Sequence, residues 1–430
     1  MVTRLNGPAK FSIFLCMFTR KLDVRRDTSQ FSLKSAVMGG RMPEASAAGA
    51  QDFELYLNSI RRFTEEKLIP AERQVEEEDK VPEEIVEEMR RLGLFGMTIP
   101  ESYGGLGLSM EQQVRATFEF TRASCVYRAR FSTTLGLCSQ AILFNGTDEQ
   151  KSEWLPKLAS GEATASFALT EPQAGSDAGA ISTKAVKAGT DYMINGQKCY
   201  ITNAPEADVF IVMARTDPET TSAKGISAFI VPADTPGIEI ASWDRKLGNH
   251  GSHTAQIFFD DCYVSRANLL GGVEGHGFKN AMAGINVARM HVAATCVGQA
   301  DRLIDMGRDY ATGRIQFGHP ISDFQAVQHM LAESYAETLA ARSMVLETAR
   351  LIDVGKRPLA DMSSCKLFAS EMVCRVADRI LQIHGGAGYM AAFDVERFYR
   401  DVRLFRIFEG ASEVHKMIIS REMLKGKSVR

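Results

Sequence analysis

The sequence lacks a surplus of charge of either sign, and it lacks a long hydrophobic run. Its 430 residues include 50 Lys and Arg against 53 Asp and Glu, a formal net charge of -3. This balance gives no electrostatic footprint for nucleic acid or for an acidic membrane surface, so neither is expected as a partner. The longest apolar run near the start, residues 11–18, is far shorter than the roughly 20 residues needed to cross a bilayer. A soluble protein is therefore expected.

Paired cysteines and clustered metal ligands are also missing. The eight cysteines include no Cys-x-x-Cys pair and lie mostly in apolar runs such as Met372-Val373-Cys374. This pattern is typical of reduced core thiols in an intracellular protein, and neither a disulfide framework nor a zinc site is expected. His250 and His253 have a ligand-like spacing, but no carboxylate or thiolate pattern completes a site around them. No metal is expected.

The first 50 residues differ in composition from the rest of the chain. The segment is basic, poor in acidic residues and rich in serine, as organelle transit peptides are. A disordered tail, or a true start at Met38 or Met42, are alternatives that the sequence leaves open. We expect residues 1–50 to stand outside the fold. The expected location is the cytoplasm, or the mitochondrial matrix if the extension is a transit peptide.

The hydrophobic period divides the remainder into three domains. Residues 51–163 are helical, with Phe53, Leu57, Ile60 and Phe63 at spacings of three and four. Residues 164–273 contain short branched and aromatic segments separated by turn signals, which predicts a compact antiparallel β-domain with a hairpin at Asn195-Gly196. The predicted strands are residues 164–169, 191–194, 198–202, 208–214, 225–231 and 254–259. Residues 274–430 return to the helical period over three long stretches, of which the second carries Val327, Leu331, Tyr335 and Leu339, and predict a bundle. The fold class is α+β, without the βαβ unit of a Rossmann domain.

One glutamate near the C-terminus has unusual sequence neighbours. Glu409 is preceded by Ile407 and Phe408 and followed by Gly410 and Ala411, so the residues beside it are apolar or small. A carboxylate in a dehydrated pocket has a raised pKa and is suited to act as a base. The alternative is an ordinary surface glutamate, because most glutamates are exposed.

Two further segments could contact a flat cofactor. The segment Leu169-Thr-Glu-Pro-Gln-Ala-Gly-Ser-Asp177 offers hydroxyls, small residues and backbone N–H groups directly after a predicted strand. Such a loop can lie along a heteroaromatic ring and a pyrophosphate, although an ordinary β-turn is the alternative. Tyr200-Ile-Thr-Asn203 places an aromatic ring and a hydroxyl together.

Five motifs together resemble the acyl-CoA dehydrogenase family over residues 51–425. Besides the segment ending at Asp177, they are Ile194-Asn-Gly-Gln-Lys-Cys-Tyr-Ile-Thr-Asn203, Arg314-Ile-Gln-Phe-Gly-His-Pro-Ile321, Gln382-Ile-His-Gly-Gly-Ala-Gly-Tyr389 and Phe408-Glu-Gly-Ala-Ser-Glu413. All occur in the family's order and spacing. The resemblance implies the family's fold of an N-terminal helical domain, a middle β-domain and a C-terminal domain like a four-helix bundle.

The resemblance also implies an FAD cofactor and the residues that bind it. The flavin would be held by Phe167, Leu169, Thr170, Gly175, Ser176, Tyr200, Ile201, Thr202, Ala411, Ser412 and Glu413. The adenosine-pyrophosphate half, held partly by a neighbouring subunit, would contact Arg314, Phe317, Gln325, Gln382, Ile383, Gly385 and Gly386. The substrate would contact Ser176, Asn286, Arg289 and Gly410, with Arg289 near the coenzyme A moiety.

By the same resemblance, Glu409 is the catalytic base. A thioester α-proton is too weakly acidic for a carboxylate in water, so the carbonyl must be polarised while the base is desolvated. In the family the donors are the backbone N–H of the base, here Glu409, and a ribityl hydroxyl of FAD. Glu409 would remove the α-proton while FAD N5 takes the β-hydride, leaving a trans-2-enoyl-CoA. Some members carry the base just before the arginine, where this chain has Ala288.

Departures from the family pattern concern the substrate. Phe408 and Ala411 replace a tyrosine and a threonine around the base. Arg128, in Cys125-Val-Tyr-Arg-Ala-Arg130, matches an arginine that faces the distal carboxylate in the glutaryl-CoA dehydrogenase branch, and Asn286-Val-Ala-Arg289 also resembles that branch. The hypothesis is a polar or acidic acyl tail; a structural or surface arginine is the alternative.

The sequence therefore predicts an oxidoreductase of acyl-CoA metabolism that acts on a CH–CH group. By resemblance it passes electrons to an electron-transfer flavoprotein and forms a homotetramer. The rivals are a flavin oxidase or monooxygenase of the same fold and a scaffold that has lost the flavin. The resembling oxidases carry an extra C-terminal domain, and Glu409 argues against a monooxygenase.

Overall fold

The computed structural model describes residues 47–220 and 222–425. The predicted transit peptide, the alternative starts and Cys16 lie outside the described residues. None of the helices between residues 47 and 425 is both long and apolar enough to cross a membrane.

The N-terminal part is helical. Phe53, Leu57, Ile60 and Phe63, whose spacing predicts the first helix, are all buried. The Ser109 and Thr147 side chains cap the fourth and seventh helices, each paired with a glutamine three residues on. The helices are α1 (Ala47–Phe63), a π-helical turn (Thr64–Leu68), α2 (Ile69–Glu78), α3 (Glu83–Arg91), α4 (Met110–Phe120), α5 (Cys125–Thr133), α6 (Ser139–Asn145) and α7 (Asp148–Ser160).

The middle part is a curled sheet whose order is β1-β4-β2-β3-β7-β6, with β5 also paired to β4. Most pairings are antiparallel, as predicted, but β4 runs parallel to both β1 and β2. The β2 and β6 strands were not predicted. The strands are β1 (Ala165–Ala168), β2 (Lys184–Ala188), β3 (Asp191–Thr202), β4 (Val209–Arg215), β5 (Ile226–Pro232), β6 (Ile238–Ile240) and β7 (Thr254–Val264).

The hairpin predicted at Asn195-Gly196 is wrong. These residues lie inside the continuous strand β3, at a register shift against β7. The glycine serves close packing instead: a Cβ on Gly196 would lie 2.5 Å from the side chain of Thr183. Asn195 bonds the backbone N–H of Asp261 across the bulge at 2.8 Å. The turn that joins β2 to β3 lies at Gly189, which has a φ of 68°.

The C-terminal part is a bundle of long helices: α8 (Gly277–Gly313), α9 (Gln325–Asp353), α10 (Leu359–His384), α11 (Val395–Val402) and α12 (Ser412–Leu424). A hairpin of β8 (Ile315–Gln316) and β9 (His319–Pro320) joins α8 to α9. The predicted α+β fold class is confirmed. However, Tyr335 and Leu339, part of the apolar series that predicts α9, are exposed, and the buried face of α9 carries small residues such as Ser334 and Ala341.

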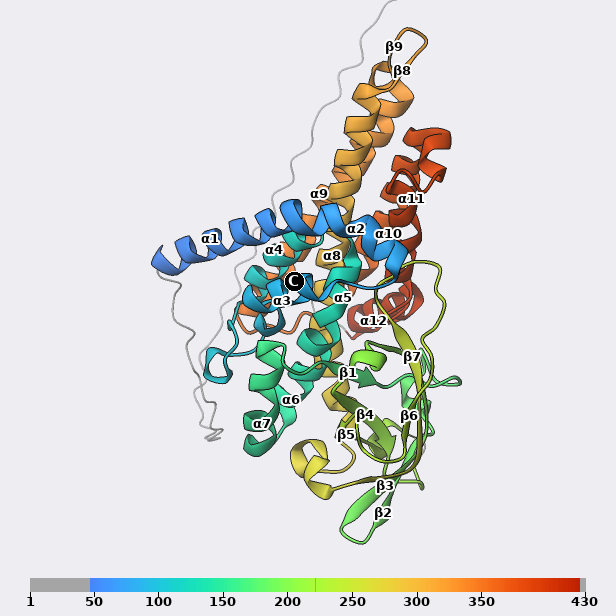
Figure 1. Cartoon of the computed structure of the whole chain (residues 1–430). Helices are drawn as coiled ribbons and strands as arrows, with labels where there is room; N and C mark the ends of the chain where they lie inside the picture. The colour runs from blue at the N-terminus through green and yellow to red at the C-terminus, as the bar shows by residue number, and fades with distance from the viewer. Residues whose placement is uncertain (1–46, 221, 426–430) are drawn as a thin grey trace, which may run out of the picture. The chain divides into compact units, whose positions relative to one another are not determined.

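Helix α8 extends from the sheet to the far end of the bundle. Near its start Gly277 packs against the backbone of Ser227 in β5, and at its other end lies the β8–β9 hairpin (Figure 1). Two buried polar contacts connect other parts. Glu72 of α2 pairs with Arg397 of α11 at 2.7 Å, and the backbone N–H of Asn249, before β7, donates to Asp401 of α11.

Candidate active site

Glu409 lies in a strained turn between a short 3-10 segment (Arg403–Arg406) and α12. Its φ is 52°, a left-handed value that is rare for a residue other than glycine, and the next residue, Gly410, has a φ of 97°. A Cβ on Gly410 would lie 3.1 Å from Nε2 of His415. Both the backbone conformation and the crowding therefore require glycine at position 410.

Three buried cations act on the Glu409 carboxylate: Arg128 of α5, Arg289 of α8 and Lys366 of α10. Burial raises the pKa of Glu409 to about 7, even though the three cations lower it. The residue as a whole is half-buried. The result is a dehydrated carboxylate that occurs in both protonation states near neutral pH.

Two of these cations also bind the backbone of the turn. Arg289 donates through Nε to the Glu409 carbonyl at 3.4 Å and through Nη1 to Oδ1 of Asn286 at 2.8 Å. Lys366 donates through Nζ to the Gly410 carbonyl at 2.6 Å. His415 of α12 is buried against Gly410, and burial lowers its pKa to about 3, so the ring is neutral.

Lys366 and His415 were missed by sequence reasoning. One signal was present: Lys366 lies three residues before Ala369, in line with the buried apolar series of α10. A charged residue on the buried face of a helix is rare enough to mark a special position.

Arg128 is buried, and among the described residues its Nε has no hydrogen-bond partner. Burial lowers its pKa to about 10, and Glu409 raises it. The same guanidinium helps to lower the pKa of the buried His291 to about 3, after burial itself. The surface alternative for Arg128 is therefore excluded by its position. A buried guanidinium without a carboxylate in contact is suited to receive an anionic group.

The first group of predicted cofactor residues lies at the ends of β1 and β3, next to α5. Asn203 follows Thr202 and donates through Nδ2 to the carbonyl of Ala129, the neighbour of Arg128, at 2.8 Å. Leu169 and Ile201 are buried. The half-buried or exposed members are Phe167, Thr170, Gly175, Ser176, Tyr200 and Thr202.

A buried ion pair that sequence reasoning missed holds this loop. Lys198 donates through Nζ to Oε1 of Glu171 at 2.7 Å and to the Leu169 carbonyl at 3.1 Å. Glu171 also accepts from the backbone N–H groups of Ser182 and Thr183. The loop backbone is therefore fixed on both sides. Beside it, Tyr200 has a φ of 57° and is 70% exposed.

The second group of predicted cofactor residues lies at the far end of α8. Tyr310 of α8 stacks on His384 of α10 with ring centroids 4.2 Å apart, which brings the ends of these helices together. Phe317 is 90% exposed with a φ of 54°. Ile383 is buried, and the exposed members are Arg314, Phe317, Gln325, Gln382, Gly385 and Gly386.

Within one chain the two groups are far apart. The 24 steps from Arg289 to Gly313, the last residue of α8, span about 36 Å at a rise of about 1.5 Å per residue, and Arg314 follows directly. The structure brings Glu409, Gly410, Arg289, Asn286 and Arg128 together with the start of α12, which carries Ala411, Ser412 and Glu413. It does not bring Arg314, Phe317 or Gln325 to them.

The residues present fit an FAD. Ideal Cβ atoms placed on Gly175, Gly385 and Gly386 meet nothing within 4 Å, so a flat ring or a phosphate can approach these backbones closely. The hydroxyls of Thr170, Ser176 and Thr202 add donors that are at least partly exposed.

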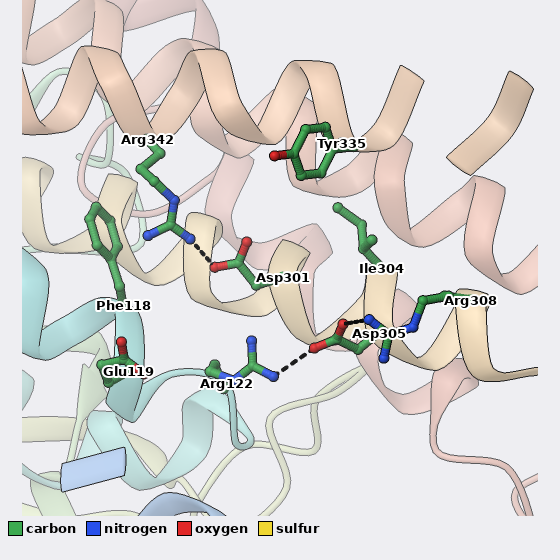
Figure 2. A pocket seen from close by; sticks show the side chains of 9 residues that line it. All are labelled: Phe118, Glu119, Arg122, Asp301, Ile304, Asp305, Arg308, Tyr335 and Arg342. Atoms are coloured by element: carbon green, nitrogen blue, oxygen red, sulfur yellow. Dashed lines mark hydrogen bonds and ion pairs between the residues drawn. The ribbon is translucent and has the colours of Figure 1, made fainter. Parts of the chain in front are cut away.

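Two surface cavities lie apart from this site. The first, of about 410 Å³, is lined by side chains of α4, α8 and α9, and its carboxylates face arginines (Figure 2). Asp305 pairs there with Arg122 at 2.7 Å and with Arg308 at 2.8 Å. The second, of about 540 Å³, is lined by arginines, acidic and apolar side chains of α10, α11 and the Arg403–Arg406 segment, together with Leu247. Glu409 lines neither cavity.

The two histidines with metal-ligand spacing make hydrogen bonds with carboxylates instead. His253 stacks on Trp243 at 4.5 Å and bonds Glu206 at 2.6 Å, and His250 bonds Glu76 at 2.9 Å. Between residues 47 and 425 no three His, Cys, Asp or Glu side chains are placed to hold a metal. The described cysteines are free and mostly buried, as predicted.

The family models for the N-terminal, middle and C-terminal domains of acyl-CoA dehydrogenase match residues 50–162, 166–262 and 275–424. This chain belongs to the acyl-CoA dehydrogenase family. It is thus an oxidoreductase of a family whose members are flavoproteins.

Several acyl-CoA dehydrogenase relatives cover most of the chain. It is 41% identical to the acryloyl-CoA reductase (NADH) of Anaerotignum propionicum, over 90% of this chain and 98% of the relative. It is 40% identical to the caffeyl-CoA reductase–Etf complex subunit CarC of Acetobacterium woodii, over 82% of this chain and 92% of the relative. The solved glutaryl-coenzyme A dehydrogenase in complex with glutaryl-CoA is 36% identical, with a TM-score of 0.83 over 88% of this chain and 96% of that one.

Proposed function

We propose that this acyl-CoA dehydrogenase family member oxidises an acyl-CoA thioester to the trans-2-enoyl-CoA, with Glu409 as the base that removes the α-proton. The observation that carries the proposal is the setting of Glu409: a carboxylate whose pKa is raised by burial to about 7 and that is faced by three buried cations. At that pKa the base is ionised in a large fraction of molecules at neutral pH and still accepts a proton strongly.

The chain's own residues support the proton transfer in three ways. The helices around Glu409 exclude water, which strengthens its attraction for the α-proton. The backbone N–H of Glu409 is proposed to donate to the thioester oxygen as negative charge develops there. Gly410 leaves room for the thioester because it carries no side chain. Ala288, just before Arg289, cannot serve as a base.

FAD is the proposed cofactor, and when bound it supplies the acceptor for the β-hydride. The loops at the ends of β1 and β3, with Ala411, Ser412 and Glu413, would hold its flavin. The group at Arg314, Phe317, Gln325 and Gln382–Gly386 would hold the adenosine half of an FAD whose flavin lies in a neighbouring chain, because about 36 Å of helix separates that group from Arg289 in its own chain. A homotetramer, proposed from the family resemblance, supplies such neighbours.

Arg128 is proposed to bind a carboxylate at the far end of the acyl group. Its guanidinium is buried and its Nε is unpartnered, which disfavours the empty site and favours an anion there. Asn286 and Arg289 would then contact the thioester side. The likeness to glutaryl-coenzyme A dehydrogenase supports this choice.

The test of the acidic tail is a comparison of glutaryl-CoA with butyryl-CoA in wild type and in Arg128→Ala. We expect the kcat/KM ratio of the two thioesters to fall in the variant by about 100-fold, the value of a lost charge-assisted contact of about 3 kcal/mol. Arg130→Ala, two residues further along α5 and so on another side of the helix, is the control. An unchanged ratio in Arg128→Ala removes this part of the proposal.

The reverse reaction, reduction of an enoyl-CoA, is the second candidate. Two similar proteins are reductases, and a carboxyl with a pKa of about 7 is also protonated often enough to donate a proton to the α-carbon. The direction would depend on the electron partner. We propose electron-transfer flavoprotein, which fits the Etf-associated relative, and a cytoplasmic or mitochondrial-matrix location.

The deciding experiment mixes the purified, flavin-loaded protein anaerobically with acyl-CoA thioesters that differ in length, branching and terminal charge. We expect rapid loss of flavin absorbance with the true substrate, and recovery on adding electron-transfer flavoprotein or an enoyl-CoA. Fast peroxide formation in air would indicate an oxidase. A colourless protein that takes up no FAD would indicate a scaffold, and Glu409→Gln that keeps full turnover would overturn the assignment of the base.

A further inference from the structure

Lys366 has a burial and a partner that are unusual for a lysine. Its side chain is fully buried on α10, and its Nζ donates to the Gly410 carbonyl at 2.6 Å. Buried lysines normally pair with a carboxylate, but here the hydrogen-bond acceptor is backbone. Glu409 and Glu371 act on Lys366 through charge at longer range. An ammonium group has therefore been desolvated in order to hold one peptide carbonyl.

That carbonyl belongs to the strained turn. Glu409, at a φ of 52°, occupies the left-handed region, which costs a residue with a side chain about 1–2 kcal/mol. Such a conformation persists only where its surroundings fix it. Both carbonyls of the turn are met by cations: Arg289 contacts that of Glu409 at 3.4 Å, and Lys366 contacts that of Gly410. The shorter bond, from Lys366, is the stronger restraint.

We propose that Lys366 is a positioning residue for the reaction: by holding the Gly410 carbonyl it fixes the left-handed turn that aims the Glu409 carboxylate at the substrate. The proposal rests on the proposed function, in which Glu409 is the base. A displacement of about 1 Å at a reacting group costs on the order of 100-fold in rate. Lys366 also supplies a positive charge that stays in place while negative charge moves from the carboxylate to the thioester.

Other charged or titratable groups share this site and must stay in place during a test. The groups that face Glu409 come from four helices and are Arg128 of α5, Arg289 of α8, Lys366 of α10 and His415 of α12. The groups that act on Lys366 are Cys296, Glu409, Arg289 and Glu371. Lys366 binds the Gly410 carbonyl at 2.6 Å, and the His415 ring also acts on the backbone of Glu409 and Gly410.

The test compares Lys366→Met, which removes charge and hydrogen bond at similar length, with Lys366→Arg, which keeps both, and Lys366→Gln, which keeps a neutral donor. Lys356→Met, at an exposed position just before α10, is the matched control. For each variant, kcat and KM are measured against pH with the thioester that wild type converts best. In parallel, the Glu409 carboxyl is titrated by infrared spectroscopy and assigned by the loss of its band in Glu409→Gln.

We expect Lys366→Met to lower kcat by about 100-fold while KM changes less than about threefold. In this variant the pKa of the Glu409 carboxyl should rise by about one unit, because Lys366 lowers that pKa in the wild type. Lys366→Arg should recover most of kcat, Lys366→Gln should recover part of kcat but not the pKa, and Lys356→Met should match wild type.

A Lys366→Met protein that is less stable but keeps wild-type kcat and carboxyl pKa would overturn the proposal and leave a structural role only. If Lys366→Met does not fold, Lys366→Gln is judged by the same criterion. The infrared titration needs no turnover. A wild-type protein that converts no thioester would therefore overturn the proposed function, while the pKa of the Glu409 carboxyl would still decide whether Lys366 acts on that carboxylate.

Discussion

Glu409 is dehydrated by helices that are remote from it in the sequence. Its apolar sequence neighbours contribute less than their identity indicates, because Ile407 is 56% exposed. The groups that surround the carboxylate come from α5, α8, α10 and α12 instead. A raised pKa could thus be predicted from the sequence, but for an incomplete reason: residues hundreds of positions apart meet only after folding.

The activity of the wild-type protein should have an acid limb near pH 7. Glu409 must be ionised to accept a proton, and its pKa is about 7. We expect kcat/KM to fall about tenfold per pH unit below pH 7 and to level off above it. A pH–rate profile would check this, measured with a thioester that dissociates from the enzyme faster than it reacts. A limb near pH 4.5 would mean that burial does not govern this carboxyl.

The same carboxyl should affect stability with the opposite trend. Because the folded pKa of Glu409 lies above its unfolded value of about 4.5, the folded state binds the extra proton, and stability is lost as pH rises from about 5 to 7. Relative to wild type, Glu409→Gln should gain about 2 kcal/mol between pH 5 and pH 8. Urea unfolding at both pH values measures the gain. Glu413→Gln, exposed at the start of α12, should show no such trend.

Gly410→Ala should lower both the stability of the fold and the rate of the reaction. The left-handed φ of 97° and the contact 3.1 Å from His415 make any side chain unfavourable there. We expect a loss of about 2 kcal/mol and at least a tenfold lower kcat. Gly355→Ala is the control, because Gly355 has a similar φ of 81° with open space around it. If both variants lose rate equally, crowding at position 410 is not the cause.

At the scale of elements, helices were easier to predict than strands. The long helices carry many turns of consistent periodicity, so α8 and α10 follow from their sequence. The strand β3 was divided in two because Asn195-Gly196 is also a strong turn signal. Here the tertiary contact with Thr183 decides the outcome. The pairing of β4 with the distant strands β1 and β2 left no local trace in the sequence.

The ion pair between α2 and α11 should be the most sensitive polar contact between elements. Burial raises the pKa of Glu72, while Arg397 at 2.7 Å and the backbone N–H of Ser124 at 2.6 Å favour its charged form. Glu72→Gln would leave the Arg397 charge buried and should cost about 3–5 kcal/mol in unfolding free energy. Glu77→Gln, an exposed partner of Arg73, should cost less than about 1 kcal/mol.

Replacing both members of this pair tests the reason for that loss. If an uncompensated charge is responsible, Glu72→Met combined with Arg397→Met should be more stable than Glu72→Gln alone. A double variant that is less stable than the single one would show that the hydrogen bonds, rather than the charge, maintain this contact.

At the scale of the whole molecule, the exposed apolar side of α9 is consistent with the proposed assembly. Tyr335 and Leu339 are 62% and 51% exposed, one helical turn apart, and continue the line of the half-buried Val327 and Leu331. Rows of exposed apolar residues on a long helix commonly pack against another chain. The sequence pattern predicted this helix correctly, but a single chain could not show which partner the row contacts.

Leu339→Glu should therefore dissociate the assembly and release the cofactor, because the two groups of cofactor residues would then lie in separate molecules. We expect a smaller species in light scattering and at least a tenfold weaker retention of FAD. Val354→Glu, equally apolar and 71% exposed at the end of the same helix, is the control. A Leu339→Glu protein that keeps its size and its flavin would contradict the shared-cofactor arrangement.

Because α8 is unbroken, it fixes how the two groups of cofactor residues are oriented relative to each other around the helix axis. Arg289 lies on α8 and Arg314 directly follows its last residue, so adding a single residue to the helix between them would rotate one relative to the other by about 100° and advance it by about 1.5 Å. In the proposed assembly, α8 thus fixes the distance and the angle between the two groups of cofactor residues in every subunit. An insertion of one residue should misalign every FAD site that two neighbouring chains are proposed to share. An insertion of seven residues, close to two full helical turns, should restore the angle and change only the distance between the two groups.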